Sequence, residues 1–172
     1  MRTLVPAALL ALGLPALAST AVQMDVPALT RAATDVVRGR VVSSTPAWTG
    51  DHRRIVTRVT VQVVESWKGT AAGTLTVVQP GGEIDGIGQR VDGVAPLAGG
   101  DEVVLFLERS GPNHRVVGLA QGVYRVSTDG ATPRAVPAAL EGLHLAAPAG
   151  PAPAARVAMT IPELRDAVRA TR

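Results

Sequence analysis

The feature that most constrains the fold is an alternating run of residues near position 60. Its odd-numbered positions carry apolar or β-branched side chains: Ile55, Thr57, Val59, Val61 and Val63. Most positions between them are polar: Arg58, Thr60 and Gln62. Because the side chains of a strand alternate between its two faces, this period of two predicts a strand with one buried face.

Two further runs flank this strand. The run before it, residues 35–44, alternates apolar and charged positions, and the run after it, residues 74–79, keeps Leu75 and Val77 in phase. Gly39 falls on the inner face of the first run, where a glycine lets a strand coil as small closed sheets require. Three consecutive strands with turns between them predict an antiparallel meander.

The remaining apolar runs complete the predicted domain. Residues 101–108 contain an unbroken apolar stretch, which predicts a central strand buried on both faces. Two shorter strands are predicted over 115–119 and 123–127. A loop is predicted over 43–54, with Trp48 as a lid on the core. We therefore expect an all-β fold, a small antiparallel β-barrel.

Helices are predicted before and after the barrel. Residues 27–33 have a helix-favouring composition, and Thr160 followed by Glu163 predicts a capped, amphipathic C-terminal helix. The segment before this helix is rich in Ala and Pro, which is typical of a linker. The predicted organisation is a signal peptide over 1–21, a β-barrel domain over 22–136, a linker over 137–159 and a C-terminal helix over 160–172.

The first residues have the features of a secretory signal peptide. Arg2 precedes an uncharged apolar stretch, and the small residues Ala16 and Ala18 suit signal peptidase, with a cut after Ala21 as the alternative. The stretch is too short, and too interrupted by proline and glycine, for a membrane span. We expect a periplasmic or secreted protein with no stable membrane anchor.

Composition excludes several classes of function. The chain has no cysteine, which excludes a lipoprotein anchor, disulfide bonds and thiol catalysis. Aromatic residues make up 2%, so stacking platforms for nucleic acid are nearly absent. Only one group of arginines comes close to a cluster: Arg38, Arg40, Arg53, Arg54 and Arg58. We interpret it as a solvated face of neighbouring strands, and we expect no nucleic-acid partner.

Catalytic motifs are also missing from the sequence. There is no G-x-S-x-G elbow, no H-E-x-x-H pair and no P-loop. The histidines His52, His114 and His144 lie far apart. We expect no catalytic residues, no cofactor and no metal site, and therefore a protein that is not an enzyme.

An acidic, glycine-rich loop leaves one alternative open. Glu83, Asp85 and Asp92 share this loop, and carboxylate oxygens there could bind calcium or serve a metal-dependent hydrolase. The three acids lack the tight alternating spacing of a calcium-binding loop. We interpret them as solvated turn residues and keep the metal site as the alternative.

Three segments together resemble the netrin and TIMP-like modules. They are residues 33–41, the alternating strand that ends in Trp67-Lys68-Gly69, and residues 101–107. Those modules are barrels of the OB type, so the resemblance implies an OB-like closed sheet here. Inhibitors of that family place an amino-terminal cysteine on the zinc of a metalloprotease, a mechanism that this cysteine-free chain cannot use. The chain also resembles exported bacterial proteins with the same Lys-Gly turn and Pro-Gly-Gly loop.

These observations predict an exported, non-catalytic binding module that recognises or inhibits a secreted protein partner. A small barrel fills its interior with side chains, so a partner would be held by the rim and the connecting loops. The longest irregular segment of the predicted barrel is the loop over 79–100. The predicted binding residues are in this loop and in the turn after the second strand: Trp67, Lys68, Gly81, Gly82, Glu83, Asp85, Arg90 and Asp92. The alternative for Trp67 is that it plugs the end of the barrel.

Overall fold

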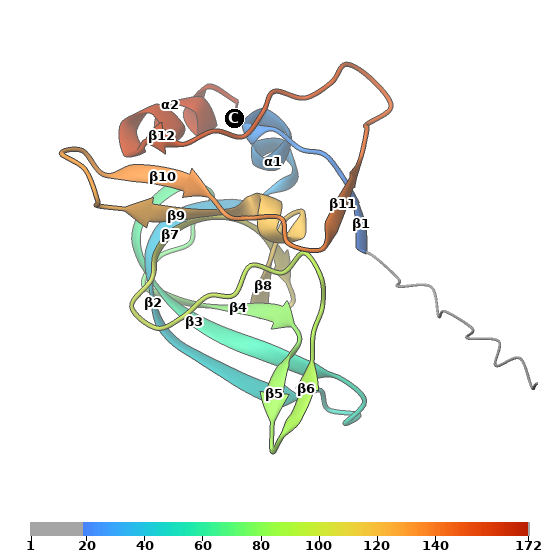
Figure 1. Ribbon diagram of the computed structural model, residues 1–172. Coiled ribbons are helices and arrows are strands. Elements are labelled where there is room, and N and C mark those ends of the chain that lie inside the picture. Colours follow the sequence, from blue (N-terminus) through green and yellow to red (C-terminus); the bar gives the residue numbers. More distant parts are fainter. Residues whose placement is uncertain (1–18, 172) are drawn as a thin grey trace, which may run out of the picture.

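The protein is mostly β-sheet with two short helices, as a computed structural model describes it over residues 19–171 (Figure 1). The main sheet of the described residues has eight strands in the order β12-β10-β9-β7-β2-β3-β4-β8, and β7 also pairs with β8. Its strands are β2 (Asp35–Trp48), β3 (Ile55–Lys68), β4 (Thr74–Pro80), β7 (Glu102–Ser110), β8 (Asn113–Val116), β9 (Val123–Ser127), β10 (Arg134–Pro137) and β12 (Met159–Thr160).

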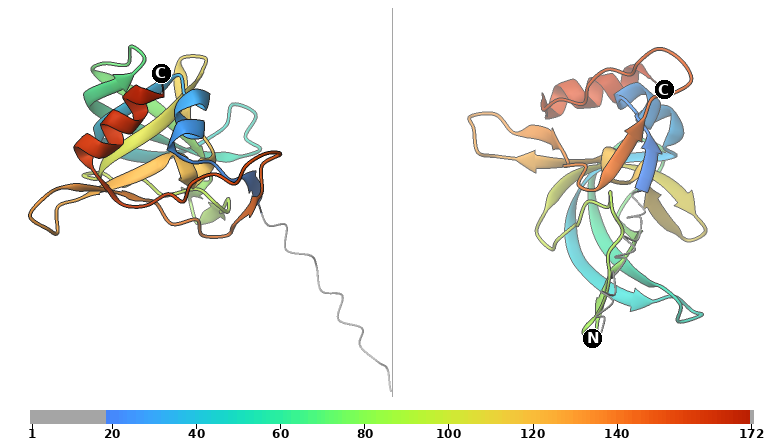
Figure 2. Two further views of the ribbon diagram at one scale, coloured as in Figure 1. Left: turned by 90° about the horizontal axis from the view of Figure 1, so that it is seen from above. Right: turned by 45° about the vertical axis from the view of Figure 1, so that its right-hand side comes forward.

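Two small sheets and three helical segments complete the described chain. Strand β1 (Ser19–Val22) pairs in parallel with β11 (Leu143–Ala146), and β5 (Gly82–Ile84) forms a hairpin with β6 (Ile87–Gln89). The helices are α1 (Val26–Ala32) and α2 (Ile161–Ala170), with a short 3-10 helix over Leu119–Gly122. Figure 2 shows α1 and α2 together over one side of the main sheet, away from the β5–β6 hairpin.

The β-rich fold with one helix before the main sheet and one after it is confirmed. The sheet is mixed rather than wholly antiparallel, because β4 and β8 run parallel where Val77 pairs with His114. The loop predicted over 43–54 is wrong in extent: β2 continues to Trp48, which leaves only residues 49–54 between β2 and β3. A register shift between Val41 and Ser43 and the exposed residues after it hid this half of the strand.

The main sheet packs against a core on each face. One core includes Val37, Val59, Val61, Leu75, Val77, Val103, Leu105 and Leu107. The other lies toward the helices and includes Leu29, Val36, Trp67, Val104, Phe106, Tyr124, Leu164 and Val168. Alternate residues of β7 enter the two cores, so the prediction of a central strand buried on both faces is confirmed.

Side-chain hydrogen bonds hold the first and last segments of the described residues in place. The buried amide of Gln121 donates to the carbonyl oxygen of Val22 at 3.0 Å and accepts from the Met24 N–H at 2.8 Å. Helix α2 has the predicted capping box, in which Thr160 and Glu163 bond to each other's backbone N–H groups. The segment 137–159, predicted as a linker, contains β11, which pairs with β1.

The predicted signal peptide falls mostly on residues 1–18, which lie outside the described residues. Residues 19–21, predicted as its end, belong to β1. Within residues 19–171, neither helix has the length and apolar character needed to cross a membrane.

Candidate binding site

Two hairpins pack against each other to form one end of the molecule. The side-chain oxygen of Gln89 accepts the Ile55 N–H at 2.7 Å, and the Thr57 hydroxyl donates to the Gly81 carbonyl oxygen at 2.8 Å. Gly82 has φ +140°, and a Cβ there would lie 2.9 Å from the Thr57 hydroxyl oxygen. A glycine is therefore needed where the β5–β6 hairpin crosses the β2–β3 hairpin. We call this region, residues 46–58 and 80–92, the hairpin end.

A cleft of about 340 Å³ opens beside the two hairpins. Its lining combines β2 and β3 with the segment that returns from β6, including Ser44, Thr57, Gly81, Gly82, Arg90 and Asp92. At its inner side the buried Gln79 donates from Nε2 to the Ala95 carbonyl oxygen at 2.9 Å. The lining combines polar side chains with glycine backbone that is partly exposed at Gly82 and buried at Gly81 and Gly93, which suits the binding of another polypeptide surface.

The turn of the β5–β6 hairpin explains why Asp85 occurs where it does. Asp85 and Gly86 both have positive φ, 52° and 77°, between the paired residues Ile84 and Ile87. An Asp-Gly pair is typical of the two-residue turn that matches the twist of a hairpin. Glu83, Asp85 and Ile87 are exposed on this hairpin, and Ile87 exposes 55% of its surface.

The tip of the β2–β3 hairpin is held by its own hydrogen bonds. The Thr49 hydroxyl donates to Asp51 at 2.6 Å, and the Thr49 N–H donates to the Arg54 carbonyl oxygen at 2.8 Å. The Thr49 hydroxyl and the Arg53 N–H together lower the pKa of Asp51. This bonding fixes the tip, because five of its six residues are joined by hydrogen bonds over a short turn.

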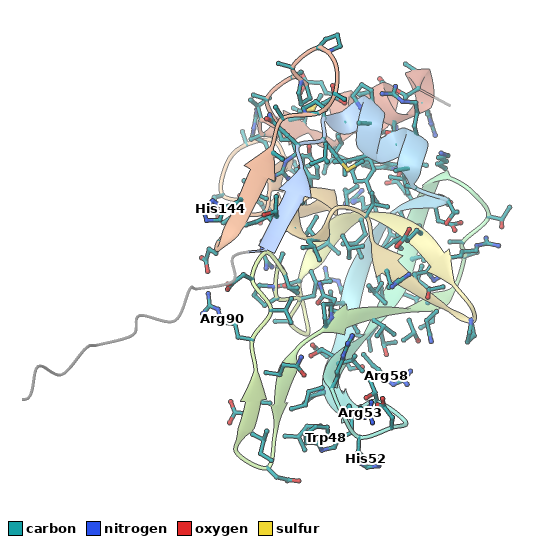
Figure 3. The ribbon with its side chains drawn as sticks, turned by 90° about the vertical axis from the view of Figure 1, so that its right-hand side faces the viewer. Trp48, His52, Arg53, Arg58, Arg90 and His144 are labelled. Atoms are coloured by element: carbon teal, nitrogen blue, oxygen red, sulfur yellow. The ribbon has the colours of Figure 1, made fainter. Side chains whose placement is uncertain are left out.

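An aromatic pair stands at this tip. His52 has φ +53°, and its ring stacks on Trp48 with ring centroids 6.3 Å apart. Figure 3 shows Trp48, His52, Arg53 and Arg58 gathered at the lower end of the molecule. The sequence interpretation treated Trp48 as a lid and the arginines as a solvated face. Thr45 and Trp48 are residue types that favour strands, but Pro46 between them does not, so local composition gave little signal that β2 continues to Trp48.

The structure does not bring all eight predicted binding residues together. Trp67 is 0% exposed, lies in the core beneath the helices, and donates from Nε1 to Glu65 at 3.1 Å. Lys68 donates from Nζ to the Thr30 carbonyl oxygen at 2.6 Å. Both residues lie at the opposite end of β3 from the hairpins. The other six residues, Gly81, Gly82, Glu83, Asp85, Arg90 and Asp92, lie at the hairpin end.

The acids considered for a metal ion have separate surroundings. Asp92 pairs with Arg90 at 3.5 Å, whereas Asp85 occupies the hairpin turn. Farther along the chain, Asp101 pairs with Arg125 at 2.6 Å. In the part of the chain that the structure describes, no three His, Cys, Asp or Glu residues converge as a metal ion would require.

The Lys-Gly turn covers a buried carboxylate that the sequence interpretation did not single out. Asp35 is 0% exposed, and its oxygens accept from Arg109 Nε at 3.0 Å and from the Thr70 N–H at 3.2 Å. Gly69 has φ +81°, and a Cβ there would lie only 2.3 Å from Asp35 Oδ1. Burial raises the pKa of Asp35, but the bonds from Arg109, Thr34 and Thr70 together hold this pKa below its usual value. Asp35 therefore fixes the turn that follows β3.

Comparison with protein-family models and with curated protein sequences gave no match for this chain.

Proposed function

We propose that the chain is an exported, non-catalytic binding module whose hairpin end recognises or inhibits a secreted protein partner. The observation that carries this proposal is the cleft of about 340 Å³, which is lined by Gly82 of β5 together with polar side chains that include Thr57, Arg90 and Asp92. Rigid exposed hairpins border it, so a partner can bind without ordering the loops first. By contrast, the buried carboxylate of Asp35 accepts internal hydrogen bonds that fix a turn.

We also propose that five strands of the main sheet form a closed barrel of the OB type. The support is a circuit of pairings: β2 with β3, β3 with β4, β4 with β8, β8 with β7, and β7 with β2. A closed barrel of this size is filled by side chains, so binding takes place at its rim. The relation to netrin and TIMP-like modules stays a prediction.

The experiment that tests the binding function shortens the β5–β6 hairpin. Gly82 and Gln89 are paired, so residues 83–88 can be replaced by an Asn-Gly turn without changing the chain on either side. We expect this variant to keep its cooperative thermal unfolding and to lose capture of the partner from a culture extract, measured by affinity purification and mass spectrometry.

A matched control is available in the β9–β10 hairpin. Ser127 and Arg134 are paired there, and residues 128–133 can be replaced by the same Asn-Gly turn. This turn lies away from the hairpin end (Figure 1), so the control is expected to capture the partner normally. Normal capture by the 83–88 variant, or equal loss in both variants, would contradict the proposed binding site.

For export, we propose that signal peptidase cuts between Ala18 and Ser19. Residues 19–22 pair with β11, so a cut after Ala21 would remove most of β1. Amino-terminal sequencing of protein from the periplasm and the medium is expected to find Ser19 first. A chain that begins at Val22, or one that retains Met1, would contradict the proposed cut.

A further inference from the structure

The hairpin end carries charged side chains without opposite charges beside them. Elsewhere on the sheet, Arg38 pairs with Glu65 at 2.8 Å and with Glu102 at 2.5 Å. At the hairpin end, three exposed arginines have no carboxylate of residues 19–171 within 4.0 Å: Arg53, Arg54 and Arg58. Three exposed acids likewise have no described cation within that distance: Asp51, Glu83 and Asp85.

These charges are separated by sign onto the two hairpins. On the β2–β3 hairpin, Asp51 is the single acid beside Arg53, Arg54 and Arg58, and its side chain is bonded to Thr49, so this hairpin has a surplus of positive charge. The β5–β6 hairpin carries only the acids. Figure 3 shows Arg53 and Arg58 on one side of this end and the β5–β6 hairpin on the other. The hairpin end is therefore positive on one hairpin and negative on its neighbour.

We propose that the hairpin end binds a second copy of this chain. A two-fold axis brings the same patch of both copies together, so each region of the patch faces its neighbour in the other copy. In this arrangement the β2–β3 tip of each copy lies against the β5–β6 hairpin of the other copy. Arg53 and Arg58 of each copy then face Glu83 and Asp85 of the other. A patch with separated charges is self-complementary in this arrangement and repels a copy that docks like against like.

Apolar groups at the same end supply contact area. Ile87 exposes 55% of its surface on the acidic hairpin, and the Trp48–His52 pair stands beside the basic tip. Aromatic residues are common at the centres of protein interfaces, whereas exposed charges mainly set orientation and rate. The hydrogen-bonded tip and the two-residue hairpin turn lose little freedom when they dock.

The test is sedimentation velocity on the chain from Ser19, which contains every described element. We expect a reversible dimer with a dissociation constant between about 10 µM and about 1 mM. This constant is expected to rise about tenfold when salt rises from about 50 to about 500 mM. Two charge-changed variants are then compared: Arg53→Glu with Arg58→Glu, and Glu83→Lys with Asp85→Asn. Asparagine is chosen at position 85 because it tolerates the positive φ of that turn.

Each variant alone is expected to stay monomeric, because its two hairpins then carry like charge. An equimolar mixture of the two variants is expected to form one-to-one heterodimers, which also shows that both variants are folded. The control, Arg31→Glu with Arg169→Glu, places on the helices the same change of charge as the Arg53→Glu, Arg58→Glu variant and is expected to dimerise like the wild type. The proposal would be overturned if the wild type were monomeric, or if either variant alone dimerised as strongly as the wild type. It would also be overturned if the mixture of the two variants stayed monomeric or if the control were monomeric. Because the hairpin end is also the proposed site for a different partner, dimerisation would compete with capture of that partner; the two are measured in separate experiments, so failure of one proposal is distinguished from failure of the other.

Discussion

The two ends of the molecule are built in opposite ways. The helix-covered end buries large side chains such as Trp67, Phe106 and Tyr124, and its polar Gln121 bonds to the backbone of the N-terminal segment. The hairpin end relies on glycines and a few hydrogen bonds, and it leaves Ile87 and several charges exposed. From this difference we expect the helix-covered end to contribute more to stability than the hairpin end, which leaves the hairpin end free to present contact groups.

The two tryptophans of the chain test this division most strongly. Trp67→Ala removes a fully buried side chain and is expected to lower the free energy of unfolding by about 3–5 kcal/mol. Trp48→Ala removes a half-buried ring at the hairpin end and is expected to cost about 1 kcal/mol or less. Urea unfolding of both variants measures the two values. Equal losses would show that the hairpin end is part of the stabilising core.

Sequence patterns predicted the strand segments that have a buried face, and they missed the segment that is exposed. The central strand β7 and the alternating part of β3 were predicted because their apolar residues follow the packing directly. The second half of β2 was missed, since residues 42–45 are exposed and a register shift interrupts the alternation. Exposed strands carry little of the hydrophobic pattern on which such predictions depend.

The candidate site was predicted only where it is continuous in sequence. The loop residues around Gly82 and Arg90 lie at one end, as expected of a single segment. Trp67 and Lys68 were grouped with them, although strand direction places both at the far end of β3. The contribution of the β2–β3 tip depends on Gly82 packing against Thr57, a contact between distant segments that local pattern does not reveal.

A buried charge near the helix-covered end gives the next largest effect. Asp35→Asn weakens the ion pair with Arg109 and the bond to the Thr70 N–H, and is expected to cost about 2 kcal/mol at neutral pH. Because the folded-state pKa of Asp35 is lowered, its carboxylate stabilises the fold above the unfolded pKa of about 3.9. That contribution is lost as pH falls through the folded pKa.

Urea unfolding across the pH range measures this effect. The wild type and the Asp35→Asn variant are expected to differ by a constant amount above about pH 5 and to converge below about pH 4. The control is Asp92→Asn at the hairpin end, where the partner Arg90 is exposed and the expected change is below about 0.5 kcal/mol. A difference between wild type and Asp35→Asn that widens toward low pH would refute the assignment.

A smaller effect is expected at the start of α2. Thr160→Ala removes the side chain that accepts the Glu163 N–H, and loss of such a cap costs about 1 kcal/mol. Thr160→Ser keeps the hydroxyl and is the matched control. Thermal unfolding gives the stability change, and hydrogen exchange of the α2 amides shows whether the helix opens locally. If Thr160→Ser lost as much stability as Thr160→Ala, the cap would not be the cause.

The smallest effect on stability is expected at the basic tip. Arg53→Ser with Arg58→Ser is expected to change the free energy of unfolding by less than about 0.5 kcal/mol, because neither side chain has an ion pair with a described residue. The double variant is expected to be slightly more stable than the wild type at low salt, since the tip loses surplus positive charge, and this gain should vanish at high salt.

Arg38→Ser is the contrasting variant, because it leaves Glu65 and Glu102 without their shared cation and should destabilise by more than about 1 kcal/mol. Urea unfolding at two salt concentrations measures both. A loss above about 1 kcal/mol in the double variant would mean that Arg53 and Arg58 hold the tip together, and the division between a stabilising end and a contact end would fail.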